Sequence, residues 1–282
     1  PDFQKLPQIR NIHASEKGRI ISGNINKDTV LVGLDTFLRG ANFNNAFVFG
    51  FDSSLNHLWS FKSDNFFDQF LESSISGDTL VASGHFNLSS NTMVTFDTVQ
   101  FSGNPNAFQG GAIFLFSVSS GQLIGFYPAD QRGNSAQITV GAAGVSKKYM
   151  GTGGSFRYRL TYSGTNNFLE AASSRSNQDL HFAVFDRQGN FVAEDKIFSS
   201  ASSNNDRTLA MHFDDSTVYI GGAIADTVIV PGIDTFFAEG RGDAFVAAYR
   251  LDIITSLHEP PSNFVKAEKG ILAYPNPTAT GS

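Results

Sequence analysis

The residue types that could bind a metal or move a proton are scattered along this chain. Its six histidines show neither His-x-x-x-His nor His-Glu-x-x-His spacing, so nothing indicates a metal centre. They are His13, His57, His85, His181, His212 and His258. Calcium requires several oxygen ligands close together, and the acidic pair Asp214-Asp215 does not define such a set. We therefore expect no cofactor, with calcium bound in a loop as the open alternative.

Sequence signatures of nucleophilic catalysis and of phosphate binding are missing as well. No Gly-x-Ser-x-Gly elbow occurs. Gly151-Thr152-Gly153-Gly154 leads into a predicted strand, whereas a phosphate cradle leads into a helix. Two carboxylates for glycoside hydrolysis need only lie within about 5–10 Å of each other, and the sequence nominates no such pair. We predict no catalytic residues and a chain that is not an enzyme.

Composition indicates a folded protein without disulfides. The 282 residues are 41% hydrophobic and include 28 Phe, which is enough for a packed core. A net charge of −6 with scattered Lys and Arg argues against nucleic acid as a partner. There is no Cys, and no apolar stretch approaches the roughly 18–20 residues of a spanning helix. Because the chain begins at Pro1 without a signal peptide, we expect a piece of a longer precursor.

A sequence pattern recurs along the chain, which predicts a repeat architecture. Residues 20–32 and 219–230 nearly superimpose, and two more copies lie between them, giving at least four repeats of 61–69 residues. The anchors of this alignment are Gly23, Gly84, Gly153 and Gly222, with Phe47, Ile113, Phe182 and Phe245. Each copy alternates apolar with small or polar residues, as strands do. We predict an all-β fold with few helices, in which residues 186–190 form a hairpin turn.

Units of about four strands that cannot cover both sheet faces alone are typical of β-propeller blades. Gly-Asp-Ala-Phe-Val-Ala at residues 242–247, together with the recurring Asp-Thr pairs, resembles the secreted β-propeller repeat of Bacteroidetes surface proteins. The resemblance covers roughly residues 8–252 and implies a four-bladed ring or part of a larger propeller. We expect repeats over 1–254 and a polar linker over 255–270. Trp59 would then pack between blades, with sugar stacking as the alternative.

The tail, residues 271–282, carries the most specific motif. An apolar run followed by Tyr-Pro-Asn-Pro-Thr and a glycine resembles the start of the C-terminal sorting domain of the type IX secretion system. The residues that carry the resemblance are Tyr274, Pro275, Asn276, Pro277, Thr278 and Gly281. It implies export across the outer membrane and recognition of the tail by the type IX translocon and its shuttle proteins. An ordinary Pro-rich turn is the alternative interpretation.

A recurring tripeptide resembles the O-glycosylation acceptor of exported Bacteroidetes proteins. It consists of Asp, then Ser or Thr, then a small aliphatic residue or Thr. The hydroxyl residues are Thr29, Thr79, Thr98, Ser216 and Thr227. A structural origin stays equally open, because Asp often closes a turn and Thr often opens a strand.

These patterns lead to one functional hypothesis and two alternatives. The first is a secreted or cell-surface β-propeller that acts as a binding or adhesion module, with loops that recognise a surface glycan or a protein. The alternatives are a polysaccharide-active enzyme with a site in the propeller funnel and a structural subunit of an outer-membrane assembly. We expect no nucleic-acid partner and no membrane span. The fold by itself would not identify a ligand.

Overall fold

The computed structural model is built from β-strands. It describes residues 8–25, 29–32, 35–38, 45–63, 67–87, 93–96, 99–102, 109–132, 138–157, 159–162, 169–170, 179–199, 207–214, 216–224, 227–230, 234–237, 243–251 and 269–273. Every element in these ranges is a strand, which confirms the all-β prediction. In the same ranges no helix could cross a membrane, since none has the length and apolar character required.

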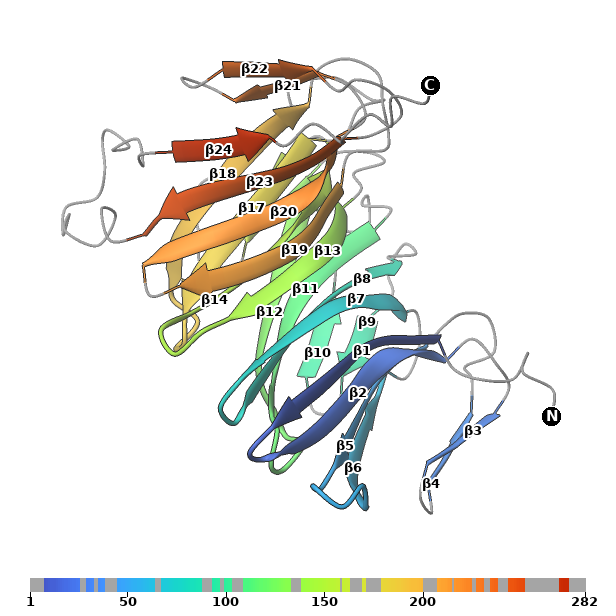
Figure 1. Ribbon diagram of the computed structural model, residues 1–282. Helices are drawn as coiled ribbons and strands as arrows, with labels where there is room; N and C mark the ends of the chain where they lie inside the picture. Colours follow the sequence, from blue (N-terminus) through green and yellow to red (C-terminus); the bar gives the residue numbers. More distant parts are fainter. Residues whose placement is uncertain are drawn as a thin grey trace, which may run out of the picture.

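Four units of like design follow one another along the chain (Figure 1). Each has four main strands, paired in chain order, and a short hairpin between the second and the third. The main strands are β1 (Gln8–Ser15), β2 (Gly18–Ile25), β5 (Asn45–Phe51) and β6 (His57–Lys62) in unit 1; β7 (Phe67–Ser76), β8 (Thr79–Asn87), β11 (Gln109–Ser117) and β12 (Leu123–Arg132) in unit 2; β13 (Ile138–Val145), β14 (Tyr149–Phe156), β17 (Asp179–Asp186) and β18 (Phe191–Ser199) in unit 3; and β19 (Arg207–Asp214), β20 (Thr217–Ile224), β23 (Asp243–Arg250) and β24 (Lys269–Ala273) in unit 4. The hairpins are β3 (Thr29–Val32) with β4 (Asp35–Leu38), β9 (Met93–Phe96) with β10 (Val99–Ser102), β15 (Arg159–Tyr162) with β16 (Leu169–Glu170), and β21 (Thr227–Val230) with β22 (Asp234–Phe237).

The sheets stack face to face, and the core lies between them. We call the face of a unit that points to the next unit its following face, and the opposite one its preceding face. Val48 on the following face of unit 1 packs in one cluster with Phe114 of unit 2. Similar clusters join unit 2 to unit 3 and unit 3 to unit 4. Both faces of the middle units are therefore buried, which explains their nearly continuous apolar strands.

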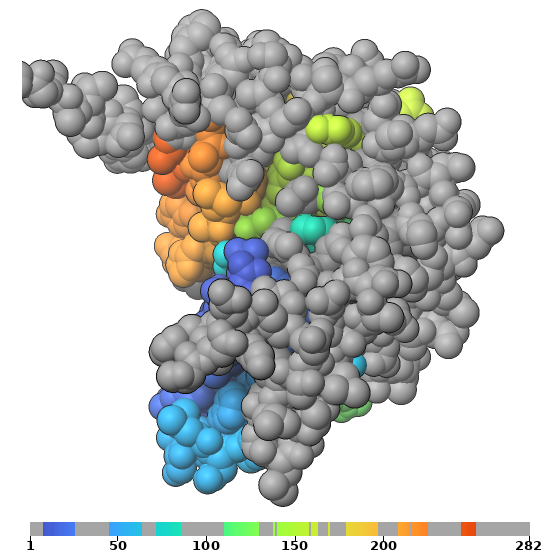
Figure 2. Space-filling view, turned by 90° about the vertical axis from the view of Figure 1, so that its right-hand side faces the viewer, coloured from blue at the N-terminus to red at the C-terminus, as the bar shows by residue number. Residues whose placement is uncertain are grey.

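The first strands of the units run along one side of the stack. β7 contacts β1 and β13, and β13 contacts β19. Each first strand has a register shift against its second strand, so each bends at a bulge. Units 1 and 4 lie at opposite ends of the stack (Figures 1 and 2), and the described strands close no ring.

Two of the hairpins pair with the preceding unit. β15 of unit 3 pairs with β12 of unit 2, and β21 of unit 4 pairs with β18 of unit 3. These pairings extend the sheets of units 2 and 3 to six strands each. Backbone hydrogen bonds thus join unit 2 to unit 3 and unit 3 to unit 4, in addition to the face packing.

The structure places the alignment anchors of units 2 and 3 differently from those of units 1 and 4. Gly23 lies opposite Phe47, and Gly222 lies opposite Phe245, as the alignment requires. In unit 2, however, Gly84 lies opposite Ala112 rather than Ile113. In unit 3 Gly153 does lie opposite Phe182, but this pair is on the following face, and the equivalent pair on the preceding face is Gly154 with His181. A shift of one residue moves a side chain to the other face, so Ile113 and Phe182 belong to following faces.

An aromatic residue on a fourth strand meets the hairpin turn of the next unit. Trp59 in β6 donates a hydrogen bond from Nε1 to the Val118 carbonyl oxygen at 2.8 Å. A Cβ on Gly121, which has φ +72°, would lie 2.4 Å from the Trp59 ring. Tyr127 in β12 lies equally close to Gly189, which has φ +86°. Trp59 therefore packs between units, as predicted, and the glycines permit both the left-handed turn and the close approach.

The last strand spans the expected boundary between the linker and the tail. β24 pairs with β23 along its whole length, from Lys269 to Ala273. The end of the expected linker and the first three residues of the expected tail thus supply the fourth strand of unit 4. Tyr274 and the rest of the sorting motif lie outside the described residues.

We predict that Gly121→Ala destabilises the chain more than Gly77→Ala. Gly77 also has a left-handed φ, +61°, but a Cβ there would meet nothing within 4 Å. Both changes incur backbone strain of about 1–2 kcal/mol, and Gly121→Ala adds the displacement of Trp59, about 1–3 kcal/mol. Urea unfolding followed by circular dichroism measures both. Equal losses for the two variants would refute the aromatic contact as a source of stability.

Candidate functional site

Polar side chains gather where the first strands of units 1 and 2 meet. We call this group the junction cluster; it consists of Arg10, Asn11, His13, Glu72 and Ser73. His13 Nε2 and Ser73 Oγ are 2.8 Å apart. In the amide orientation that satisfies both groups, Asn11 Nδ2 donates to Glu72 Oε2 at 2.9 Å and Asn11 Oδ1 accepts from Ser73 N at 3.3 Å. Two strands from different units therefore share one polar surface.

The junction cluster is partly exposed and carries perturbed charges. Arg10 is exposed, while Asn11, His13 and Glu72 are half-buried. Burial raises the pKa of the Glu72 carboxyl, and the positive charge of Arg10 opposes that rise. Burial also lowers the pKa of His13, against a smaller opposing effect of its hydrogen bond to Ser73. The cluster offers hydrogen-bond donors and acceptors to a polar ligand at the surface.

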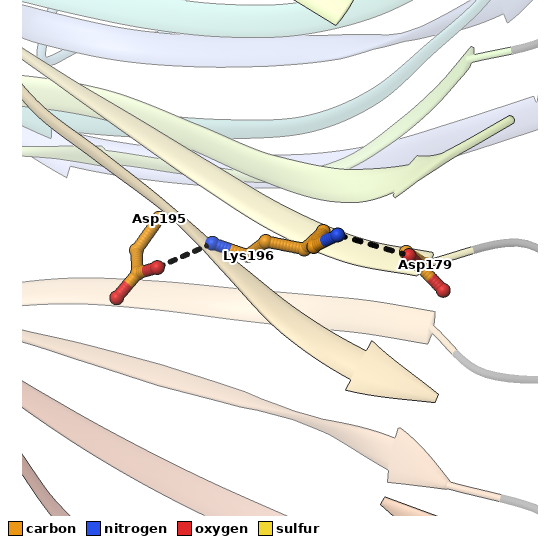
Figure 3. Close-up of polar contacts among 3 residues, drawn as sticks. All are labelled: Asp179, Asp195 and Lys196. Carbon is orange, nitrogen blue, oxygen red and sulfur yellow. Dashed lines mark hydrogen bonds and ion pairs between the residues drawn. The ribbon is translucent and has the colours of Figure 1, made fainter. Parts of the chain in front are cut away.

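A second polar group, which we call the hairpin cluster, lies inside unit 3 beside the crossing hairpin. It consists of Tyr162, Asp179, His181, Glu194 and Lys196. The Tyr162 hydroxyl oxygen is 2.6 Å from His181 Nε2, and both side chains are fully buried. Lys196 Nζ lies 3.7 Å from Asp179 Oδ2 (Figure 3). In the same view, the backbone N of Lys196 donates to Asp195 Oδ1 at 2.7 Å.

Burial dominates the electrostatics of the hairpin cluster. It lowers the pKa of His181 to about 3, against an opposing backbone hydrogen bond at Gly154. It raises the pKa of Glu194 to about 7, with a smaller contribution from the neighbouring Asp195 charge. The Tyr162 pKa is raised by burial and by Glu194. The hydrogen bond between neutral His181 and Tyr162 offsets part of the cost of burying both groups, and it ties the hairpin to β17.

The described carboxylates with raised pKa come from different units. Among the side chains that the structure describes, Glu72 and Glu194 are the carboxylates with raised pKa, and they lie in β7 and β18 of different units. No group of three or more His, Asp or Glu side chains in the described ranges could hold a metal ion. Asp186 accepts hydrogen bonds from Gln188 N and Asn190 N, as a turn residue does, which confirms the predicted hairpin.

The five candidate glycosylation residues have different surroundings. Thr79 is 7% exposed, and its hydroxyl accepts a hydrogen bond from Arg187. The adjacent Asp78 carboxylate accepts from Ser117 and Ser119, so this Asp-Thr pair has a structural role. Ser216 is half-buried at the start of β20. Thr29 and Thr227 open strands β3 and β21, and Thr98 and His258 lie outside the described residues.

Sequence reasoning did not find either cluster. Tyr162 and His181 belong to no sequence motif. The junction cluster joins residues 10–13 to residues 72–73, which are distant in sequence. His181 lies in the third strand of unit 3, β17. The partners of the histidines depend on the pairing of whole strands, and no local spacing signals it.

We predict opposite pH dependences for two variants of the hairpin cluster. The unfolded chain binds a proton at His181 with an ordinary pKa near 6.5, whereas the folded chain binds it only near 3. The stability advantage of wild type over His181→Gln should therefore shrink by about 1.4 kcal/mol for each pH unit below 6.5. For Glu194, whose folded pKa is about 7, the advantage over Glu194→Gln is present below pH 4.5 and is lost as the pH rises toward 7.

Urea unfolding at a series of pH values tests this prediction. Parallel pH profiles for wild type and His181→Gln would show that His181 is not buried in its neutral form. The Glu194→Gln profile is the matched comparison, because it should change in the opposite direction over an overlapping pH range.

No protein-family model matches this chain, and no curated protein matches it at a significant level. The repeated sheets, the junction cluster and the tail motif are therefore the observations on which a functional proposal must stand.

Proposed function

We propose that this chain is a secreted or cell-surface binding module whose four units are blades of a β-propeller. The observation that carries the proposal is the junction cluster, a partly exposed polar surface on first strands that rigid, stacked sheets hold in place. Support for the blade interpretation comes from the sequential face packing and from hairpins that pair with the preceding unit. Rigid scaffolds that position polar surfaces and loops are well suited to recognition.

The chemistry of the junction cluster favours a hydroxyl-rich ligand, so we propose a surface glycan. Arg10 supplies a cation with several donors, Asn11 supplies both a donor and an acceptor, and Glu72 supplies acceptors. Groups of this kind can replace the hydrogen bonds that sugar hydroxyls make with water. A protein ligand, the other partner considered, would be recognised by the same groups.

We propose export by the type IX secretion system on the basis of the tail motif. The strand β24 ends at Ala273, directly before Tyr274. Cleavage after Ala273 would leave the fourth strand of unit 4 complete. The two alternatives have separate support. Glu72, with its raised pKa, is a carboxylate that a polysaccharide-active enzyme could use, and the exposed face of unit 4 described below suits a subunit of an assembly.

We predict that Arg10→Ala weakens glycan binding at least about tenfold, because a charge-assisted hydrogen bond contributes about 1.5–3 kcal/mol. A bacterial glycan array identifies the ligand, and titration calorimetry with that glycan compares the variants. Lys148→Ala is the matched control, because Lys148 is an exposed cation in the turn between β13 and β14. Binding by wild type that Arg10→Ala leaves unchanged would remove the junction cluster from the proposal.

We predict that the protein isolated from its native cell envelope or culture medium has lost the sequence beyond about Ala273. Tandem mass spectrometry of the C-terminal peptides measures this. The same spectra should show hexose-type additions at Ser216 and none at Thr79, because the Thr79 hydroxyl is buried. An intact tail in a cytoplasmic fraction would contradict the export proposal.

A further inference from the structure

Unit 4 exposes the sheet face that the other three units bury. The third strands of the four units carry equivalent apolar residues at one position of the following face, where each lies opposite a small residue of the second strand. These residues are Val48, Ile113, Phe182 and Val246. The first three are at most 2% exposed, because the next unit covers them, whereas Val246 is 41% exposed.

The second strands give the same result. Ile20 in β2 and Val81 in β8 are 0% exposed, whereas Tyr219 at the equivalent position of β20 is 38% exposed. Around Tyr219 and Val246 the face of unit 4 is lined by small residues, including Ala244 and Ala248. The exposed His212, which lies opposite Tyr219, adds a polar group to this face, so it is an exposed and largely small-residue surface on which another sheet can pack.

The existing contacts indicate what kind of surface fits this face. Unit 2 covers unit 1 with Phe114 and Phe116 of its third strand, and unit 4 covers unit 3 with Phe245 and Tyr249 of its third strand. Unit 1 carries Phe47, Phe49 and Phe51 on the corresponding preceding face. Ile21 and Phe51 of that face are only partly buried.

The free edges match as well. The fourth strands β12 and β18 each pair with a hairpin from the next unit, whereas β6 and β24 each end their sheets without one among the described strands. At the other end of the chain, β3 and β4 pair with each other alone in the described part. In one copy the two ends lie apart (Figures 1 and 2), so they cannot cover each other there.

We propose that the following face of unit 4 binds the part of the preceding face of unit 1 that is still accessible, around Ile21 and Phe51, in a second copy of this chain. The contact continues, between copies, the packing that already joins each unit to the next. Such a head-to-tail contact uses two different surfaces and yields a ring if the rotation closes or a filament if it does not. The gain comes mainly from removing Tyr219 and Val246 from water, since Phe47 and Phe49 are already buried in one copy.

Sedimentation velocity over a range of concentrations gives the first test. We expect wild type to form dimers or larger species as its concentration rises, and Val246→Asp to remain monomeric with an unchanged thermal unfolding profile. Ile124→Asp is the matched control, because Ile124 is 53% exposed on β12, outside this face; it should associate like wild type. A wild type that stays monomeric, or a Val246→Asp variant that still associates, would overturn the proposal.

Cross-linking distinguishes the arrangement of the copies, because the chain has no Cys of its own. Val246→Cys and Ile21→Cys are treated with a bismaleimide that reaches about 10 Å, the spacing of packed sheets. We expect a cross-linked dimer only when the two variants are mixed. Cross-linking of Val246→Cys alone would show a two-fold contact instead, and an intramolecular cross-link in the double variant would show closure within one chain; either result refutes a head-to-tail contact between copies.

Discussion

Burial of apolar sheet faces between successive units is the interaction on which the rest of this structure depends. A four-stranded sheet with apolar residues on both faces is not stable alone in water, so the middle units require a neighbour on each side. The residues at the centre of these contacts, such as Val48, Phe114 and Val184, are completely buried. Without Cys, the chain has no disulfide to replace this packing.

Directional contacts then fix how the units sit on one another. Hairpins of units 3 and 4 pair with the preceding sheet through backbone hydrogen bonds, and Trp59 and Tyr127 pack on the turn glycines of the next unit. The Tyr162–His181 hydrogen bond holds one crossing hairpin to its own unit. Because a buried polar group without a partner is costly, this pair disfavours any other placement of the hairpin.

The same stacking creates the surfaces that we connect with function. Asn11 and Glu72 come from different units, so the junction cluster exists only where β1 lies beside β7. The following face of unit 4 is exposed. The stack therefore offers one surface for recognition, at its first strands, and another for association, at its end. A glycan-binding module that associates through its terminal units would present its binding surface in several copies, which raises avidity.

The sequence by itself determined that the chain is β-rich and built from four repeats. Period-two alternation and turn residues such as Asp186 and Asn190 are local signals, so they can be read from the sequence alone. Tertiary structure alone decided which sheet face the alignment anchors of units 2 and 3 occupy. Ile113 and its neighbour Ala112 are both apolar because both faces of a middle sheet are buried, so alternation cannot tell which one faces which unit.

Long-range pairing also decided the rest of the candidate site. The crossing of β15 onto β12, the contact of Asn11 with Glu72 and the burial of His181 beside Tyr162 each join residues that no motif connects. Such contacts depend on which sheet edges and faces meet, and that choice is made by the combined free energy of whole interfaces rather than by any short segment.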